Sequence, residues 1–287
     1  MLKPKFIMLV GIPGAGKTAH ATDLASAIRG VHLSSDAIRK ELYGDESFLG
    51  DPSEVFALMH SRTLDILANG GNVIYDATNV TRKDRLSILS KLPKYVDIYC
   101  HIIWAPIETC IERDEKRDRN VTKVIIDKML KRFQAPYYDE GFDDIMIIRP
   151  FDFDRDKYTK DIINSLDIPH DNPHHEYSVL KHSDAAEAYL ELYSPELRLA
   201  GLLHDIGKPY TKSFKNGKGE DTDVAHYYQH QNVGAWMSYG CSGVTPYVAW
   251  LISNHMCPFS KDKYYRCLPH YLKKNLGLLH EADLNAH

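Results

Sequence analysis

The sequence has little of what marks secreted, membrane-spanning or fibrous proteins. Five cysteines occur among 287 residues and no two form a Cys-x-x-Cys pair, which disfavours a disulfide framework and a zinc ribbon. No apolar run approaches the roughly 20 residues that cross a bilayer. Internal repeats and low-complexity tracts are also lacking. We therefore expect a globular protein of a reducing cytoplasm, without a membrane partner.

An excess of positive charge is lacking as well. The formal net charge is -4, which is not the profile of a protein that coats nucleic acid. A local basic patch that grips one strand end remains compatible with this balance. The chain is rich in histidine, with 15 residues, most of them at or after His170. The length suffices for two domains, and the histidine excess belongs to the C-terminal one.

The first half of the chain alternates between two hydrophobic patterns. Short apolar runs predict strands at 5–10, 30–33, 73–76, 96–104 and 145–148. Amphipathic stretches predict helices at 19–28, 53–68, 82–91, 106–119 and 122–133. Alternation of this kind is typical of an α/β domain with a doubly wound parallel sheet, whose ligand lies at the carboxyl ends of the strands.

Beyond Pro150 the strand signals nearly vanish. Helices are predicted at 157–166, 175–193, 195–206, 223–239, 244–255 and 268–284. The segment 168–173 carries two prolines and an Asp-Asn pair, so it breaks the chain between two of these helices. We predict an α/β domain over 1–166 followed by an all-α domain over 167–287.

Residues 11–18 read GIPGAGKT and lie between the first strand and the first helix. Glycines at this point let backbone N–H groups turn inward around phosphates, Lys17 reaches the β- and γ-phosphates, and Thr18 can ligate magnesium. A glycine-rich turn without a ligand is disfavoured by the flanking strand and helix. The predicted nucleotide-binding loop consists of Gly11, Gly14, Ala15, Gly16, Lys17 and Thr18.

Two carboxylates end predicted strands at the same edge of the sheet. Asp36 ends the second strand, and Arg39, three residues later on a helix start, lies on the same side of the cleft. Such an Asp can orient and deprotonate an attacking hydroxyl, and the Arg can hold an acceptor phosphate. An N-cap Asp with a solvated Arg explains the spacing equally well. Asp76 closes the third strand and suits magnesium or its water, with an N-cap as the alternative.

A mixed charge run covers residues 112–120. Within it, Arg113 and Arg117 stand four apart, so they lie on one face of the predicted helix and can fold over ATP as a lid. Taken alone, a run of mixed charge is more often a solvated helix face.

The residues 11–18, Asp36-x-x-Arg39, Asp76 and Arg113-x-x-x-Arg117 together resemble the kinase module of phage-type polynucleotide 5′-kinases over about residues 5–150. The resemblance implies that Asp36 is the general base toward a 5′-hydroxyl. It also implies that Arg39 contacts the acceptor's phosphate and that the two lid arginines embrace the nucleotide. Small-molecule kinases and zeta-toxin-like kinases share this general plan.

The C-terminal half contains candidate metal ligands. His204 and Asp205 lie on an apolar helix over 197–206, and adjacent residues reach one metal only at a bend or a helix end, which Gly207 and Pro209 supply. With His182 and Asp283 they make a mixed nitrogen and oxygen set suited to manganese, iron, nickel, zinc or magnesium. Such a metal activates water and polarises a phosphoryl oxygen.

Further histidines are ambiguous. His226 and His230 stand four apart on the predicted helix 223–239, and His255 ends the next one, so they can bind a second metal or a phosphate. For His226, His174 and His175 a structural role is equally plausible. Lysines interleave with tyrosines after residue 207, which suits single-stranded nucleic acid, but a soluble surface with inward tyrosines fits as well. These cations are Lys208, Lys212, Lys215, Lys218, Lys261, Lys263, Arg266, Lys273 and Lys274.

The ordered series His182, His204-Asp205, His230, His255 and Asp283 resembles the HD phosphohydrolase superfamily over about residues 172–287. This superfamily implies an all-helical, metal-dependent phosphatase or phosphodiesterase. His182, His204, Asp205 and Asp283 match the ligands of its first metal.

Together the two halves resemble bifunctional kinase–HD enzymes that heal nucleic-acid ends. The resemblance implies ATP and Mg²⁺ at the first site and a divalent transition metal such as Mn²⁺, Ni²⁺ or Zn²⁺ at the second. It implies RNA or DNA ends as substrates and a ligase acting downstream. The alternatives are a small-molecule kinase fused to an HD nucleotidase, and a nucleotide-sensing regulator whose P-loop only binds.

Overall fold

The computed structural model describes residues 3–45, 50–117, 120–172, 177–260 and 263–286. The chain divides into two compact units, each of which is described by itself. One unit comprises Met1–Met129 and Pro136–Pro150, and the other comprises Leu130–Ala135 and Phe151–His287.

A five-stranded sheet forms the core of the first unit. Its strands run parallel in the order β2-β3-β1-β4-β5, which places β1 at the centre. Central strands of a parallel sheet are covered on both faces and read as continuous apolar runs, and Phe6–Val10 are all buried. The strands are β1 (Lys5–Val10), β2 (Gly30–Ser34), β3 (Asn72–Asp76), β4 (Asp97–Ile103) and β5 (Asp144–Ile148).

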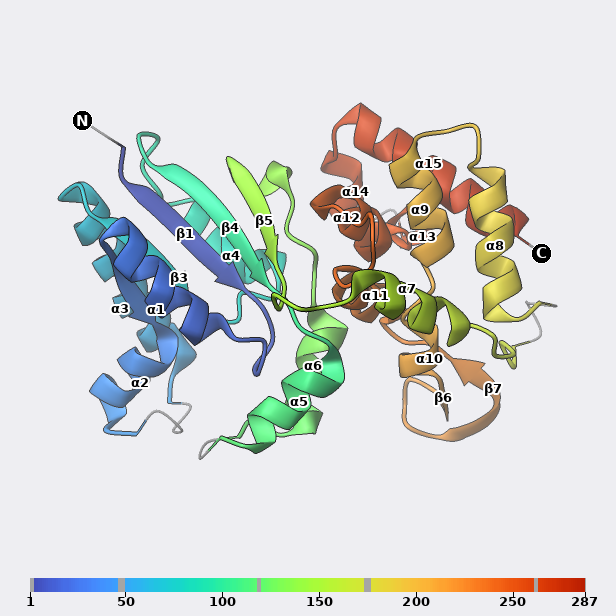
Figure 1. Cartoon of the computed structure of the whole chain (residues 1–287), viewed down its shortest axis with the longest axis horizontal. Helices are drawn as coiled ribbons and strands as arrows, with labels where there is room; N and C mark the ends of the chain where they lie inside the picture. The colour runs from blue at the N-terminus through green and yellow to red at the C-terminus, as the bar shows by residue number, and fades with distance from the viewer. Residues whose placement is uncertain (1–2, 46–49, 118–119, 173–176, 261–262, 287) are drawn as a thin grey trace. The chain divides into compact units, whose positions relative to one another are not determined.

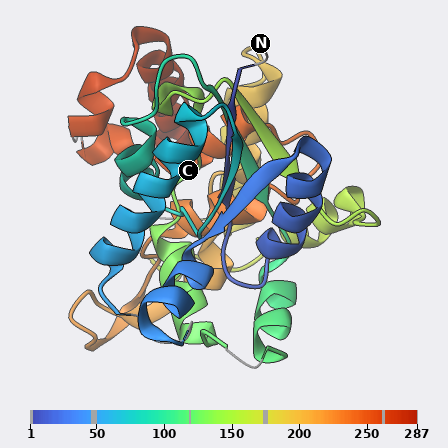
Figure 2. The same ribbon diagram turned by 90° about the vertical axis from the view of Figure 1, so that its left-hand side faces the viewer.

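Helices cover both faces of this sheet (Figure 1), and α1 and α3 lie on opposite sides of it (Figure 2). The ends of the helices are set by local chemistry. Ser34 caps α2 by accepting from the N–H groups of Asp36 and Ala37, and Asp51 caps α3 with Pro52 as its first residue. The helices are α1 (Lys17–Ile28), α2 (Ser35–Tyr43), α3 (Pro52–Ala68), α4 (Arg82–Leu89), α5 (Ile107–Glu115), α6 (Lys123–Arg132) and the 3₁₀ turn η1 (Tyr138–Glu140).

The strand order fixes where a ligand can lie. The connection after β1 leads by way of α1 to β2, on one side of β1, whereas the connection after β3 leads to β4 on the other side. In open α/β sheets such a reversal leaves a crevice at the carboxyl ends of the strands. Residues 11–18 and Asp76 both lie at this edge. The doubly wound parallel sheet predicted from the sequence is confirmed.

The second unit is helical, as predicted. Its core contains the fully buried indoles of Trp236 and Trp250 together with apolar side chains of α9, α12 and α15. The helices are α7 (Arg155–Asn164), α8 (Val179–Tyr189), α9 (Pro195–Leu203), α10 (Lys208–Thr211), α11 (His230–Ser238), α12 (Pro246–Asn254), α13 (Cys257–Ser260), α14 (Lys263–Cys267) and α15 (His270–Asn285).

A short segment from the first half of the chain also belongs to this unit. The Phe133 ring packs edge-on against the rings of Trp236 and Tyr239, at centroid distances of 5.4 and 6.0 Å. The backbone N–H of Ala135 donates to Ser253 Oγ at 3.2 Å. The two units therefore differ from the sequence division at residue 166. Residues 130–135 and 151–166 group with the helical unit because their partners are there.

One element of the second unit contradicts the sequence reading. Residues 223–226, predicted as the start of a helix, belong instead to the antiparallel hairpin of β6 (Ser213–Lys215) and β7 (Asp221–His226). The alternation of Asp221-Thr-Asp-Val-Ala-His226 has a period of two, and the turn residues Asn216 and Gly219 precede it. His226 and His230 therefore do not share a helix. Throughout the described ranges, no helix combines the length and the apolar character needed to span a bilayer.

Candidate active sites

The glycine-rich loop after β1 has the backbone that a phosphate cradle needs. Gly14 and Gly16 have φ values of 78° and 106°, which residues other than glycine adopt only with backbone strain. A Cβ on Gly14 would lie 2.0 Å from the carbonyl oxygen of Cys110, so α5 also excludes a side chain there. Lys17 begins α1 and its Nζ donates to the carbonyl of Ile12 at 3.0 Å, which turns the ammonium back over the loop.

Asp76 and Thr18 meet at the same edge. The Thr18 hydroxyl donates to Asp76 Oδ2 at 3.4 Å, and His32 Nε2 lies 2.9 Å from the same oxygen. Burial lowers the pKa of Lys17, and the Asp76 carboxylate partly offsets this. A hydroxyl and a carboxylate beside a phosphate-binding lysine are the oxygen ligands that Mg²⁺ prefers. The residues therefore fit a magnesium ion. The sequence reading missed His32, since one histidine in a strand carries no signal.

Asp36 and Arg39 lie in α2 rather than at the end of β2, which stops at Ser34. Arg39 NH1 lies 2.5 Å from Asp36 Oδ1, and the Asp36 side chain is 54% exposed while that of Arg39 is 14% exposed. Asp36 thus keeps an accessible carboxylate. The Asp36 carboxylate raises the pKa of Lys17, and the Arg117 guanidinium lowers it.

The expected lid arginines do not share a helical face. Arg113 lies in the last turn of α5, which ends at Glu115, and Arg117 lies beyond the C-cap Lys116. The backbone N–H of Arg117 donates to the carbonyl of Asp114 at 3.1 Å, which turns the chain out of the helix. The reason is local, since the buried Asp114 carboxylate accepts from the N–H groups of Val121 and Thr122. Both arginines are exposed.

In the second unit, the predicted metal ligands come together in two groups of three. His182, His204 and Asp283 form one group, and Asp205, His230 and His255 form the other, with the ligand atoms of each group within 4.8 Å of one another. Five elements and their ends supply the six residues, so the arrangement depends on the packing of α8, α9, α11, α12 and α15. Nitrogen and oxygen donors in this number fit divalent transition metals.

Asp205, a member of the second group, contacts histidines of both groups. Its Oδ2 lies 3.3 Å from His204 Nε2 and its Oδ1 lies 3.2 Å from His230 Nε2. His204 is the C-cap of α9, so the helix ends at this point and the two adjacent side chains converge. This is the geometry predicted from Gly207. A Cβ on Gly207 would lie 2.1 Å from the carbonyl oxygen of His230, so glycine also allows α11 to approach.

The four histidines are held in one orientation by the backbone. Each places Nδ1 within 2.9 Å of a backbone carbonyl oxygen, which can only accept, so Nδ1 donates and Nε2 faces the centre. The carbonyl partners are Ala286 for His182, Gly201 for His204, Tyr227 for His230 and Ile252 for His255.

Asp205 and His255 have protonation states that suit metal binding, whereas His204 favours the protonated form. Burial alone would raise the pKa of Asp205, but the His204 and Lys208 cations hold that pKa well below its usual range. Burial lowers the pKa of His255 to about 3, and His230 and His204 add to the effect. Burial also opposes protonation of His204, yet Asp205 and Asp283 outweigh it and raise its pKa to about 10. A metal would therefore compete with a proton at His204.

Two residues of this centre were not predicted from the sequence. Lys208 was read only as one of a series of lysines, yet it is buried and its Nζ lies 2.6 Å from Asp205 Oδ2. His170 is also buried, and its Nε2 lies 3.1 Å from the same Nζ. Lys208 stands three residues after Asp205 on the turn that opens α10, a spacing that could have pointed to it. His170 lies between α7 and α8, outside any helix, and gave no signal.

The remaining candidates stand apart from this centre. The His226 ring stacks on Tyr228, and His226 is in neither ligand group. His174, His175 and Lys261 lie outside the described residues. The hairpin lysines Lys212, Lys215 and Lys218 are balanced by Glu220, Asp221 and Asp223 in the same segment, so the hairpin is not a basic surface.

Comparison with known families agrees with this geometry. Residues 6–136 match a family model described as an AAA domain, and residues 170–283 match one described as an HD domain. The chain therefore joins a P-loop domain of kinase type to an HD domain. A P-loop kinase domain implies ATP and Mg²⁺, and an HD domain implies a divalent metal.

The comparison with curated proteins gave no match. Among solved structures, a chain of the Pnkp1/Rnl/Hen1 RNA repair complex is 28% identical, with 50% of this chain and 47% of that chain covered and a TM-score of 0.42. A second structure of the Pnkp1/Rnl/Hen1 complex gives 27% identity, 43% of each chain and a TM-score of 0.37. A fungal RNA kinase is 15% identical, with 70% and 95% covered and a TM-score of 0.40. This chain spans less than half the length of the first two.

Proposed function

We propose that this protein heals nucleic-acid ends. The first unit transfers the γ-phosphoryl group of ATP to a 5′-hydroxyl end, and the second removes the phosphate from a 3′-phosphate or 2′,3′-cyclic phosphate end. The observation that carries the proposal is the presence in one chain of a P-loop site with an Asp–Arg pair and a two-group HD site. One adds phosphate and the other removes it, and a broken strand is a substrate that needs both.

In the kinase site, the protein supplies a base, an anchor and positive charge. The Asp36 carboxylate accepts the proton of the 5′-hydroxyl as its oxygen attacks the γ-phosphorus and the bond to the β-phosphate oxygen breaks. Arg39 holds the phosphate of the acceptor strand and keeps Asp36 in place. Lys17 and the loop N–H groups stabilise the charge of the transferring group, and Arg113 and Arg117 close over the nucleotide.

Thr18 and Asp76 would hold magnesium, directly or through its waters. The ion would neutralise charge on the β- and γ-phosphates. His32 contacts the Asp76 oxygen that Thr18 also contacts, so it fixes the orientation of this carboxylate.

In the HD site, the two groups around Asp205 would hold one or two divalent transition metals such as Mn²⁺, Ni²⁺ or Zn²⁺. The metal would lower the pKa of water and polarise a phosphoryl oxygen. The protein orients its Nε2 atoms through backbone carbonyls and keeps its carboxylates deprotonated. The Lys208 ammonium, next to Asp205, donates to an anionic oxygen of the phosphate.

The products would be a 5′-phosphate and a 3′-hydroxyl, which are the ends that a ligase joins, so a ligase is the partner we propose. The cysteines of the described residues are free thiols, which fits a reducing cytoplasm.

The test uses one RNA strand with a 5′-hydroxyl and a 2′,3′-cyclic phosphate, and the same sequence as DNA with a 3′-phosphate. Each is incubated with the full chain, ATP, Mg²⁺ and Mn²⁺, and the products are weighed by mass spectrometry. We expect a phosphate gained at the 5′ end and a change at the 3′ end. Lys17→Ala should lower only the first rate, by about 100-fold or more, since it removes a charge that stabilises the transition state.

Two outcomes contradict the proposal. Unchanged strands, with ATP consumed when nucleosides or metabolites are added, would leave a metabolite kinase. Stoichiometric binding of ATP with no turnover on any acceptor would leave a nucleotide sensor. Full activity in Arg39→Ala would also favour the metabolite kinase, because a metabolite acceptor without a phosphate does not need this residue.

A further inference from the structure

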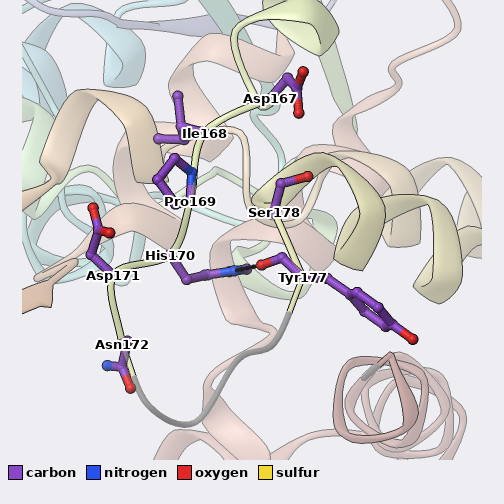
Figure 3. A pocket seen from close by; sticks show the side chains of 8 residues that line it. All are labelled: Asp167, Ile168, Pro169, His170, Asp171, Asn172, Tyr177 and Ser178. Atoms are coloured by element: carbon purple, nitrogen blue, oxygen red, sulfur yellow. Dashed lines mark hydrogen bonds between the residues drawn. The ribbon is translucent and has the colours of Figure 1, made fainter.

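One buried histidine lies beside the HD centre and outside both ligand groups. His170 is 1% exposed, and its ring packs edge-on against that of His182 at a centroid distance of 5.6 Å. Its Nδ1 lies 2.8 Å from the carbonyl oxygen of Tyr177, as Figure 3 shows, and its Nε2 lies 3.1 Å from Lys208 Nζ. His170 also lines a cavity of 430 Å³ between Asp167 and Ser178.

The two partners of the ring fix its tautomer. A carbonyl oxygen can only accept, so Nδ1 of His170 carries a hydrogen. An ammonium has donors and no acceptor, so Nε2 must accept from Lys208. His170 is therefore neutral, with its single proton on Nδ1.

The ammonium of Lys208 is confined by three neighbours. It lies 2.6 Å from Asp205 Oδ2, 3.1 Å from His170 Nε2 and 5.5 Å from the centre of the Tyr227 ring. A lysine ammonium on a four-carbon stem has many rotamers, so a fixed position requires acceptors. An acidic second acceptor would cancel the positive charge. A neutral imidazole holds the ammonium and leaves its charge available to a phosphate.

The backbone that carries His170 is itself anchored. Asp171 has a φ of 48°, a left-handed conformation that is rare for a residue with a side chain. Its carbonyl accepts from the Ala225 N–H at 2.8 Å, and its carboxylate lies 2.7 Å from Lys212 Nζ. The hydroxyl of Tyr227 donates to the carbonyl of His170. Strain that the surroundings maintain is typical of positions with a functional constraint.

We propose that His170 is a positioning residue of the HD centre, which holds the Lys208 ammonium against Asp205 so that it meets an anionic phosphoryl oxygen. The proposal rests on the phosphohydrolase function proposed above for this unit. It assigns His170 no contact with the reacting atoms, so the effect of this residue is transmitted through Lys208.

The first test does not depend on activity. In metal-free protein with ¹⁵N-labelled histidine, long-range ¹H–¹⁵N correlation distinguishes the tautomers, and the His170 signal is the one that His170→Gln removes. We expect the neutral form with a proton on Nδ1. A doubly protonated ring, or a proton on Nε2, would overturn the arrangement.

The second test is a double-mutant cycle on phosphate release from the 3′ end. His170→Leu removes the acceptor, and we expect kcat/KM to fall roughly 10- to 100-fold, since a displaced catalytic group has a cost of this size. Metal content and melting temperature should stay near those of the original chain. His170→Gln places an amide oxygen near the position of Nε2 and should recover most of the loss. In a Lys208→Met background, His170→Leu should change kcat/KM by less than about twofold.

A loss that persists in the Lys208→Met background would show that His170 acts independently of Lys208, and an unchanged His170→Leu rate would show that it does not act at all. A chromogenic phosphate ester serves as a second substrate. If the original chain hydrolyses this ester but no nucleic-acid end, the end-healing function fails and the cycle still decides the role of His170. If neither substrate is hydrolysed, both proposals fall.

Discussion

At the scale of single residues, Asp205 is the central ligand of the HD centre. The two carboxylate oxygens of Asp205 face different ligand groups, and Lys208 contacts one of them. Its low pKa keeps both oxygens available as ligands. Loss of this carboxylate therefore affects both groups, whereas loss of His255 affects one.

We predict that Asp205→Asn abolishes metal binding at the HD centre, because an amide nitrogen cannot replace an anionic ligand. Release of 3′ phosphate should fall at least about 100-fold, and 5′ phosphorylation should be unchanged. Metal content by elemental analysis and both rates are the measurements. Asp184→Asn, an exposed change on α8, is the matched control. Full metal content in Asp205→Asn would contradict the assignment.

A second prediction concerns a buried ion pair of the first unit. Arg85 and Glu140 are buried and joined by two hydrogen bonds of 2.7 and 2.6 Å, and Arg85 also donates to the carbonyl of Asn79. Glu140→Leu removes the carboxylate that neutralises this buried guanidinium and should lower the free energy of unfolding by about 3–5 kcal/mol. Combining it with Arg85→Met should cost less than Glu140→Leu alone.

Native-state hydrogen exchange at β1 and β4 measures this stability without interference from the second unit. The exposed pair of Arg62 and Glu41 supplies the control. Its Arg62→Met change should cost no more than about 1 kcal/mol. Equal costs for the exposed and the buried change would refute the prediction.

At the scale of elements, the sites lie where elements end. The P-loop joins β1 to α1, Asp76 closes β3, and His204 caps α9. The element boundaries follow from capping residues, such as Ser194 with Pro195 at the start of α9. At the end of a helix or strand, neighbouring side chains can converge on one point, which a continuous helix or strand does not allow.

The loop geometry gives a prediction at this scale. Gly14→Ala combines a left-handed φ with a Cβ that would lie 2.0 Å from a backbone oxygen of α5, so the loop must move. We expect ATP affinity by calorimetry to fall at least about 10-fold. Gly44→Ala has a similar φ of 75° but nothing within 4 Å of its Cβ, so it should cost only about 1 kcal/mol of stability and leave ATP binding intact. Equal ATP affinities in both variants would refute the role of the close approach.

At the scale of the whole molecule, each of the two units should be stabilised by the ligand of its own site. Each compact unit has its own core and its own site. A ligand stabilises the unit that binds it by mass action, by about 2.7 kcal/mol at a hundredfold excess over Kd.

We therefore predict two unfolding transitions in calorimetry. Mn²⁺ should raise one transition temperature and a chelator should lower it, and ATP with Mg²⁺ should raise the other. Asp205→Asn should remove only the first shift and Lys17→Ala only the second. A single transition that responds to both ligands in each variant would contradict the assignment of one site to each unit.

Sequence patterns were most reliable where one short segment contains the whole signal. The P-loop and the individual strands and helices needed no distant contact, whereas the ordered His and Asp series was identified by its resemblance to a family. Patterns failed where a contact outside the expected helix decides the outcome. Residues 223–226 pair with β6 instead of continuing into α11, and Arg117 leaves α5 because Asp114 binds the backbone beyond the helix. The period-two alternation of 221–226 was present in the sequence and was misassigned, whereas the Asp114 contact is not visible in local periodicity.

The sequence by itself determined the two kinds of site, since phosphate-binding loops and metal ligands need particular residue types at particular spacings. Only the tertiary structure decided which side chains meet. Packing of five helical elements divides the ligands into two groups that both contact Asp205, and it buries Lys208 and His170 beside them. The physical reason is distance along the chain: His170 and Lys208 are 38 residues apart, and no helical or strand period relates positions so far apart.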